Sequence, residues 1–192
     1  MHPSRVYLTG FMGSGKSTVG PILANVLGLR AFDLDVDVAR RAGAPVAAFF
    51  AAHGEPAFRA LEADALRATA ALDGVVVATG GGALAREPNL SWALDHGTVV
   101  YLRLPAAALA DRLARSRNVR PLLLGPDGER LSADALLARV AALLEAREPF
   151  YLRAHAIVDA DLRSIGLTVD AAARAVERFW ARAARASVNQ SR

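Results

Sequence analysis

The stretch GFMGSGKST at residues 10–18 constrains the fold of this chain more than any other. A short apolar run, Val6–Leu8, precedes it, and apolar residues at helical spacing follow it over residues 19–27. Strand, glycine turn and helix are the context in which G-x-x-x-x-G-K-[ST] forms a phosphate-binding loop. The glycines let successive backbone N–H groups point at one anion, and the following helix adds the positive end of its dipole. The motif therefore predicts a nucleotide-phosphate site rather than a chance turn.

The polar residues of this loop each have a task in such a site. We expect Lys16 to reach the β- and γ-phosphates and the hydroxyl of Ser17 to ligate Mg²⁺. Lys16 is also the one lysine among 23 Lys and Arg residues, so a strong preference for arginine spared this position. The broad fork of arginine would not replace a compact ammonium inside a nest of amides. The residues predicted to bind ATP here are Gly13, Ser14, Gly15, Lys16, Ser17 and Thr18.

Length and composition indicate a single α/β domain over residues 1–192, with no linker that would divide it. The chain is 53% hydrophobic and has no cysteine, so neither a disulfide framework nor thiolate chemistry is expected. No apolar run approaches the roughly 20 residues that span a bilayer, and the chain begins without a signal-peptide pattern. We therefore expect a soluble, cytoplasmic monomer without a membrane partner.

The charge distribution does not single out nucleic acid as a partner. The formal net charge is +4, but acidic residues are interleaved with the scattered arginines. A basic stripe near the carboxyl end is expected to be a solvated helix face; it consists of Arg174, Arg178, Arg182 and Arg185. An electropositive cleft for anionic ligands accounts for the remaining excess at least as well. We expect no nucleic-acid partner.

Apolar runs alternate with amphipathic stretches, which predicts βαβ units and a parallel sheet covered by helices on both faces. The expected strands are Val6–Leu8, Ala31–Leu34, Val75–Ala78, Val99–Leu102 and Ala156–Val158. The expected helices lie near residues 17–27, 36–52, 55–71, 88–95, 105–115, 132–146 and 168–185. Residues 116–131 lack a clear period; they form either a surface loop or, as Arg117 and Arg120 favour, a mobile lid. Residues 187–192 are expected to fray.

Two aspartates, Asp33 and Asp35, stand where the second expected strand ends. Ligands of open α/β sheets gather at the carboxyl ends of the strands, which here lie beside the phosphate loop. One aspartate can hold Mg²⁺, directly or through water, while the other binds or deprotonates an acceptor hydroxyl. The competing interpretation is that one of them caps the next helix, which is an ordinary role for Asp.

The third expected strand is followed by Thr79 and then by three glycines, Gly80–Gly82. Three consecutive glycines at a strand end predict close approach of the backbone to a ligand, since a plain turn rarely needs three. Two missing patterns exclude two classes of nucleotide-binding protein. A motor-type ATPase would place Asp-Glu after this strand, where this chain has Thr-Gly. A GTPase would carry an Asn-Lys-x-Asp segment, which a chain with no lysine beyond Lys16 cannot contain.

Three arginines, Arg59, Arg120 and Arg147, have both an ordinary and a functional interpretation. Arg59 and Glu62 are three residues apart, so they can form a surface pair worth only a few tenths of a kcal/mol. Arg147 precedes a proline that is expected to stop its helix, and there it can complement the carboxyl end of that helix. Taken together, however, the three arginines suit an anionic substrate better than a neutral one.

These segments, in this order, resemble shikimate kinase from Val6 to about Arg178. The telling stretches are GFMGSGKST, FDLD, GEPAFRALE at 54–62, VVVATGGGA at 75–83, RPLL at 120–123 and REPFY at 147–151. The resemblance implies transfer of the γ-phosphoryl of ATP to the 3-hydroxyl of shikimate, in the pathway to chorismate and the aromatic amino acids. It also implies a three-layer αβα fold of the P-loop kinase type, with a five-stranded parallel sheet in the order 2-3-1-4-5.

The resemblance assigns roles by matching positions. Asp35 would bind the shikimate hydroxyls and act as base or orienting group, within a substrate-binding segment of about residues 35–62. Arg59 and Arg147 would hold the carboxylate, and the Gly80–Gly82 backbone would contact the ring hydroxyls. Ser17 would ligate Mg²⁺, with Asp33 holding a metal-bound water. Lys16 and Arg120 would stabilise the transferring phosphoryl, and closure of the lid would exclude water. Arg115 and Arg163 match positions that hold the adenine.

Two other functions remain open at this point. One is a P-loop kinase of another small hydroxyl acid, similar to gluconate kinase, because pocket shape is not visible in a sequence. The other is a non-catalytic ligand sensor on the same scaffold. Such a sensor should carry a DNA-binding segment or lack Lys16, Asp33 or Asp35, and this chain has all three residues.

Overall fold

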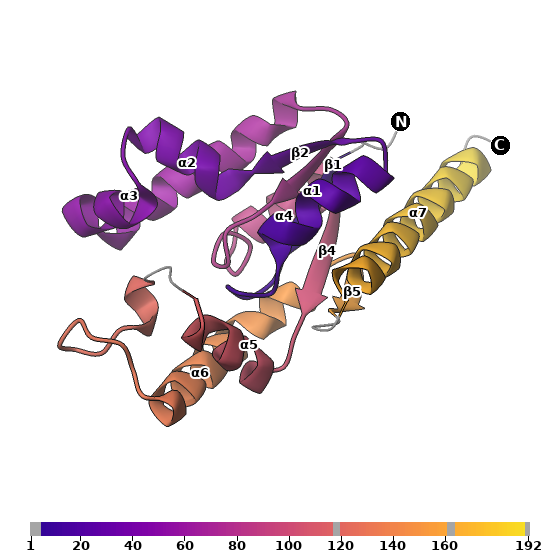
Figure 1. Ribbon diagram of the computed structural model, residues 1–192. Helices are drawn as coiled ribbons and strands as arrows, with labels where there is room; N and C mark the ends of the chain where they lie inside the picture. Colours follow the sequence, from indigo (N-terminus) through magenta and orange to yellow (C-terminus); the bar gives the residue numbers. More distant parts are fainter. Residues whose placement is uncertain (1–4, 117–119, 161–163, 191–192) are drawn as a thin grey trace.

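A computed structural model describes residues 5–116, 120–160 and 164–190 of the chain. Its centre is a five-stranded sheet in the order β2-β3-β1-β4-β5, in which every neighbouring pair is parallel (Figure 1). The strands are β1 (Arg5–Thr9), β2 (Arg30–Asp33), β3 (Val75–Ala78), β4 (Thr98–Arg103) and β5 (Ala156–Asp159). The predicted strands, the parallel sheet and its order are confirmed.

Seven α-helices flank this sheet in the described part of the chain. They are α1 (Lys16–Val26), α2 (Leu34–Ala42), α3 (Val46–Ala68), α4 (Asn89–His96), α5 (Ala106–Ala114), α6 (Ala133–Tyr151) and α7 (Ile165–Gln190). α7 continues into the tail that was expected to fray, as far as Gln190. None of the described helices is long and apolar enough to cross a membrane.

The predicted helix near 36–52 is in fact divided between two helices, whereas the predicted gap between residues 52 and 55 coincides with a kink in α3. α2 ends at Gly43, whose left-handed backbone (φ 64°) closes the last turn. α3 then runs from Val46 to Ala68 with a kink at Gly54, where φ is 77° and ψ is 174°. Pro56 lies just after this kink, in a first turn whose N–H groups need no helical partner, so the helix resumes there.

The expected stop at Pro149 is also wrong, because α6 continues to Tyr151. Proline removes one helical hydrogen bond, but the bond from the Leu152 N–H to the Glu148 carbonyl oxygen (2.9 Å) closes the next turn. Tyr151 is fully buried in the core. Burial of this large side chain offsets the lost bond and keeps the last turn helical.

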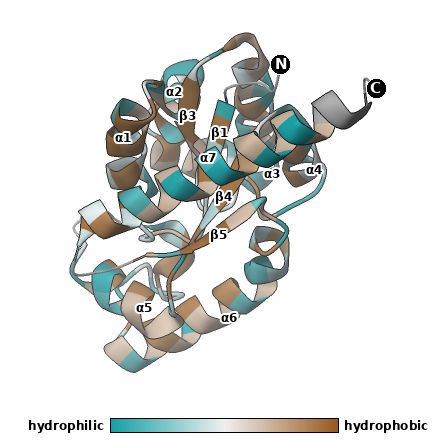
Figure 2. Ribbon diagram, turned by 90° about the vertical axis from the view of Figure 1, so that its right-hand side faces the viewer, coloured by the Kyte–Doolittle hydropathy of each residue, from teal (hydrophilic) through white to brown (hydrophobic). Residues whose placement is uncertain are grey.

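Apolar side chains alternate between the two faces of the sheet, as a parallel sheet with two covered faces requires. Val6 and Leu8 of β1 pack with α1 and α7, whereas Tyr7 packs with α3 and α4 on the other face. Figure 2 shows α7 lying across β4 and β5. A third apolar cluster joins α5, α6 and residues 120–131, which from here on are called the lid segment, to Phe11 of the phosphate loop.

Candidate active site

The phosphate loop lies between the end of β1 and the start of α1, as its sequence predicts. Gly15 has φ 99° and stands directly before α1, so the backbone turns there in a conformation that favours glycine. A β-carbon added at Gly10 would lie 2.6 Å from the Leu102 carbonyl oxygen, so the loop approaches β4 too closely for a side chain. This packing holds the loop at the carboxyl ends of the central strands.

Lys16 is buried, and its Nζ donates to the carbonyl oxygens of Gly10 (2.8 Å) and Phe11 (3.0 Å). The ammonium therefore lies against the backbone of its own loop. Burial lowers the pKa of Lys16 to about 8, because an apolar surrounding disfavours the charged form; the carboxylate of Asp35 acts in the opposite direction. An anion bound in the loop would favour the charged form in the same way.

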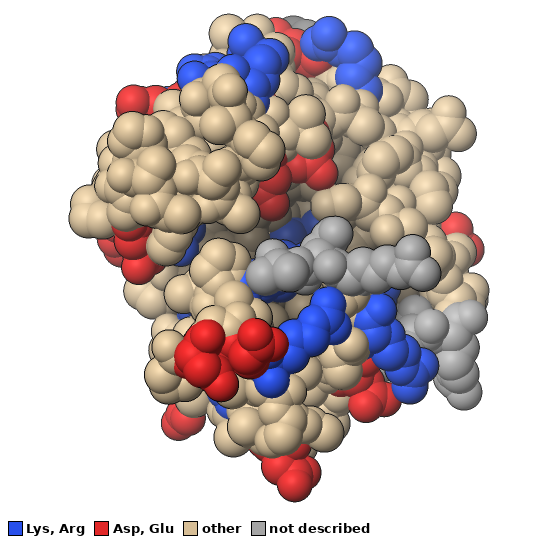
Figure 3. All heavy atoms as spheres, turned by 60° about the vertical axis from the view of Figure 1, so that its left-hand side comes forward, with Lys and Arg blue, Asp and Glu red and all other residues tan. Residues whose placement is uncertain are grey.

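A pocket of about 310 Å³ opens in front of this loop. Its walls are formed by Met12, Gly13, Gly15, Lys16, Ser17, Thr18, Asp35, Thr79, Gly81, Arg112, Leu113, Ser116 and Arg120. Figure 3 shows this face of the molecule hollowed near its centre, with acidic atoms on one wall and basic atoms in the hollow. A second pocket of about 270 Å³ adjoins the first and shares Met12, Asp35 and Arg120 with it. One cleft thus has two chambers.

The two aspartates have different surroundings. Asp33 ends β2 and caps α2, since its Oδ1 accepts from the N–H groups of Asp35 (2.9 Å) and Val36 (3.4 Å). The capping interpretation is therefore correct for Asp33. Asp35 lines both chambers. Desolvation, followed by the charge of Asp33, raises the pKa of Asp35.

Each glycine of the Gly80–Gly82 turn meets a different wall of the cleft. A β-carbon at Gly80 would lie 2.6 Å from Oδ1 of Asp35, and one at Gly81 would lie 2.9 Å from the Met12 backbone nitrogen. At Gly82 it would lie 2.9 Å from Nη1 of Arg59. The three glycines therefore let the turn fit between the phosphate loop and the acceptor chamber, which agrees with the predicted close approach.

Arg59 and Glu62 do not form the surface pair that their spacing suggested. The Arg59 and Glu62 side chains are 12% and 2% exposed, and Nη1 of Arg59 lies 2.8 Å from Oε2 of Glu62. Removing one partner of such a buried pair costs about 3–5 kcal/mol rather than tenths, because the other charge is left buried. Packing of α3 against the glycine turn causes this burial. Arg59 also lines the second chamber, with Asp35 and Phe58.

Arg147 lies inside α6 rather than at its carboxyl end, so it does not complement a helix terminus. Its guanidinium carbon stands 5.6 Å from the centre of the Phe11 ring. Nη1 is buried, and no residue in the described part of the chain accepts a hydrogen bond from it. Arg147 is absent from the linings of both chambers, but its positive charge contributes to the lowered pKa of Lys16.

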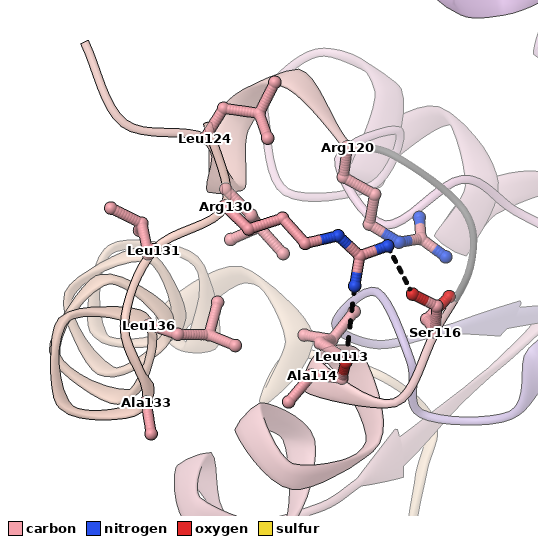
Figure 4. Close-up of a pocket in the computed structure, with 10 residues that line it drawn as sticks. Leu113, Ala114, Ser116, Arg120, Leu124, Arg130, Leu131, Ala133 and Leu136 are labelled. Carbon is pink, nitrogen blue, oxygen red and sulfur yellow. Dashed lines mark hydrogen bonds between the residues drawn. The ribbon is translucent and has the colours of Figure 1, made fainter. Parts of the chain in front are cut away.

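Arg120 is the charged residue by which the lid segment reaches the cleft, where Pro121 and Leu122 also line the second chamber. It lines both chambers, and its charge acts on the pKa of both Lys16 and Asp35. Its Nε is buried and, within the described ranges, has no hydrogen-bond partner. At the other end of the lid segment, Arg130 donates to the carbonyl oxygen of Ser116 (2.9 Å), beside the end of α5 (Figure 4). Arg130 thereby holds the base of the segment that carries Arg120.

Of the two residues predicted to hold the adenine, the structure describes Arg115. The Arg115 side chain is 82% exposed, pairs with Asp111 at 3.4 Å and lines neither chamber. Arg163 lies outside the described residues. Arg112, which the sequence did not single out, lines the phosphate chamber instead. Arg112 lies inside α5, whereas Arg115 follows the last residue of this helix and caps it; the sequence alone does not fix where the helix ends.

Comparison with known proteins identifies the family. A model of the shikimate kinase family matches residues 12–177. The chain belongs to this family. A shikimate kinase of Chlorobium phaeobacteroides is 43% identical over 182 residues, 95% of this chain and 91% of the relative. A solved shikimate kinase from Acinetobacter baumannii, in complex with shikimate, has a TM-score of 0.80 and 32% identity, and covers 95% of each chain.

A solved structure of a gluconokinase, the kind of kinase considered as the first alternative function, is also similar to this chain. A gluconokinase from Sinorhizobium meliloti matches with a TM-score of 0.61 at 21% identity, over 99% of this chain and 98% of that chain. A likeness at this level of identity concerns the fold alone. The shikimate kinase family model, in contrast, spans the phosphate loop from Met12 together with Asp35, Arg59 and Arg147.

Proposed function

We propose that this protein transfers the γ-phosphoryl group of ATP to the 3-hydroxyl of shikimate, giving shikimate 3-phosphate and ADP. Membership of the shikimate kinase family supports this reaction. The observation that carries it is the cleft with two chambers. The phosphate loop lines one chamber, Arg59 lines the other, and Asp35 and Arg120 line both. A donor phosphate and an acceptor hydroxyl would therefore meet beside the same two side chains.

The donor side consists of Gly13–Thr18, with Lys16 as its charged group. The ammonium would leave the carbonyl oxygens of Gly10 and Phe11 and bind the β- and γ-phosphates, whose charge compensates for its burial. The hydroxyl of Ser17, and Asp33 through a water, would hold Mg²⁺; this donor set fits a cation that keeps most of its waters and takes phosphate oxygens. When bound, Mg²⁺ neutralises charge on the phosphates.

The acceptor side consists of Asp35, Arg59, Arg147 and the Gly80–Gly82 turn. Asp35 has a raised pKa, so as a carboxylate it is a stronger base than an ordinary aspartate and can accept the proton of the attacking hydroxyl or orient it. Arg59 and Arg147 would bind the shikimate carboxylate. The Nη1 of Arg147, which has no hydrogen-bond partner among the described residues, supports its part in this pair.

Arg120 would stabilise the γ-phosphoryl during transfer. Phosphoryl transfer depends on positioning and charge neutralisation more than on covalent help from the protein. The buried Nε of Arg120, which lacks a partner among the described residues, supports this role. We also propose that the lid segment restricts the access of water, which would otherwise compete with shikimate as the acceptor.

The adenine would lie beside the face of α5 that carries Arg112. This proposal replaces Arg115, whose side chain is largely exposed and paired with Asp111. A β-carbon at Gly15 would lie 3.8 Å from Nη1 of Arg112, so this guanidinium stands next to the phosphate loop. We further propose a cytoplasmic monomer that works without a nucleic-acid partner; light scattering on the purified protein would give its mass in solution.

An ADP-release assay with several acceptors tests the reaction. Shikimate, gluconate and other small polyols would be offered at equal concentration with ATP and Mg²⁺, and the product with shikimate would be identified by mass spectrometry. We expect turnover with shikimate far above that with any other acceptor. Faster turnover with gluconate or another polyol would overturn the proposal, and shikimate binding without any turnover would support a sensor instead.

A further inference from the structure

Tyr151 is a buried polar side chain that the proposed reaction does not use. It is the last residue of α6 and is fully buried. Its ring lies 5.1 Å from that of Tyr101, at an angle of 35°. Its hydroxyl donates to the carbonyl oxygen of Gly81, which is 70 residues away in the sequence. This bond connects α6 to the glycine turn, whose Gly81 lines the phosphate chamber.

The glycine turn has few ways to hold its own position. Without side chains it cannot interlock with its neighbours, and its backbone passes between the Met12 nitrogen on one wall and the Asp35 and Arg59 side chains on another. Within the described residues, the Gly80 and Gly82 carbonyl oxygens accept from N–H groups of the same turn, those of Ala83 (3.1 Å) and Ala85 (3.2 Å). The Gly81 carbonyl oxygen is held from outside the turn, by Tyr151.

The hydroxyl of Tyr151 is a permanent donor. Burial raises its pKa to about 12, although the charge of Arg147, one helical turn earlier, acts in the opposite direction. The phenol therefore keeps its proton throughout the neutral range and donates to the Gly81 carbonyl oxygen at every pH at which the protein works. Tyr151 thus stands between two elements of the acceptor side, the glycine turn and Arg147.

We propose that Tyr151 is a positioning residue for the acceptor. Its hydroxyl fixes the position of the Gly80–Gly82 turn, next to the guanidinium of Arg147. In this position the turn backbone can contact the acceptor ring. The proposal rests on the proposed function, since it assigns a task within the same site. Tyr151 itself touches neither substrate, because its side chain is covered by protein on all sides.

The neighbouring Tyr101 is a matched control. It is also buried, packs against Tyr151, and donates from its hydroxyl to Oε1 of Glu148 at 3.1 Å. That bond does not involve the glycine turn. Tyr151→Phe and Tyr101→Phe therefore each remove one buried hydroxyl from the same aromatic pair, and only the first releases the turn. A purely structural role would give the two variants the same kinetic behaviour.

The test compares the two variants with the wild type in steady-state kinetics and thermal unfolding. We expect Tyr151→Phe to raise the KM for shikimate about tenfold, because the hydrogen bond to the Gly81 carbonyl oxygen is lost. The KM for ATP should stay within about twofold of that of the wild type. Tyr101→Phe should leave both KM values within about twofold. Added shikimate should raise the Tm of Tyr151→Phe less than that of Tyr101→Phe, which measures binding without turnover.

Two results would overturn the inference. One is a KM for shikimate that rises equally in both variants, and the other is an equal rise of the KM for shikimate and for ATP in Tyr151→Phe. A wild-type protein that does not phosphorylate shikimate would instead overturn the proposed function, so the two failures are distinguishable. Because phenylalanine keeps the buried ring, both variants should fold, and their Tm values without shikimate verify this.

Discussion

The donor side and the acceptor side of the cleft are built in opposite ways. The donor side is one continuous stretch, residues 10–18, whose backbone N–H groups and single lysine form a phosphate nest. The proposed acceptor side draws on α2 for Asp35, on α3 for Arg59, on the turn after β3 and on α6 for Arg147. A site made from local backbone can be recognised as a motif, whereas a site made from distant side chains depends on how the helices pack.

The largest expected effect is on the donor side. Lys16→Ala should lower kcat by about 10³-fold or more, because it removes a positive charge from the phosphoryl group in transfer. Lys16→Arg should not restore activity, since a planar fork does not fit the space occupied by the ammonium. The ADP-release assay measures both variants. Activity near that of the wild type in Lys16→Ala would contradict the assignment of the loop.

Asp35→Asn tests the residue that both chambers share. We expect kcat to fall by about 10²–10⁴-fold, the range of a lost general base, with the fold intact by circular dichroism. Asp37→Asn is the matched control on the same helix. Asp37 pairs with Arg40 and Arg41 and lines neither chamber, so its loss should lower Tm and leave kcat close to that of the wild type. A mild loss in Asp35→Asn would reduce its role to structure.

Arg147→Ala should separate the acceptor from the donor in kinetic terms. We expect the KM for shikimate to rise about 10–100-fold, the size of one charge-assisted contact, while the KM for ATP changes little. Shikimate analogues without the carboxylate should bind the variant and the wild type alike. An unchanged KM for shikimate would remove Arg147 from the acceptor side and leave Arg59 to bind the carboxylate.

The pH dependence should report on Lys16. Its pKa is lowered to about 8, so in the free protein the ammonium loses its proton as the pH rises through this value. The kcat/KM for ATP should therefore fall above about pH 8, by about tenfold per pH unit at the limit. Bound phosphates favour the charged form, so kcat should stay level to higher pH. A kcat/KM for ATP that is flat from pH 7 to 10 would contradict this assignment.

The smallest effect concerns the adenine. Arg112→Ala should raise the KM for ATP a few-fold, about 2–10-fold, because one exposed contact to the nucleotide is lost. Arg115→Ala should leave the same constant unchanged, since that side chain faces solvent and pairs with Asp111. The reverse result would return Arg115 to the site. Neither variant should change the KM for shikimate, which keeps the two sides of the cleft distinct.

Local patterns explain how far the fold was predictable. Alternating apolar runs located all five strands, because a buried parallel strand needs apolar side chains on both faces. The interruption at Gly54 falls in the predicted gap between residues 52 and 55, but the break at Gly43 and the continuation of α6 past Pro149 were missed. In each case packing against a neighbour, or one backbone conformation, outweighed the local tendency. The family resemblance added the strand order, which periodicity does not contain.

The candidate site was predictable to a different extent on its two sides. The sequence predicted the places of the phosphate loop, the two aspartates and the triple glycine, because strand ends meet at one edge of a parallel sheet. The burial of the Arg59–Glu62 pair was not, since a three-residue spacing looks the same on an exposed and on a buried helix face. The bond from Tyr151 to Gly81 spans 70 residues and has no signature in either segment.

The sequence alone predicted a phosphate-binding loop at residues 10–18, and the layered α/β domain that it predicted around that loop is confirmed. Backbone amides and glycine conformations are local properties, so nine residues were enough. Only the tertiary structure decided that Arg112, rather than Arg115, lines the cleft. It also decided that each glycine of Gly80–Gly82 meets a different wall and that Tyr151 reaches this turn. Those facts depend on where helices cross the sheet, and helix crossings are set by the packing of the whole core.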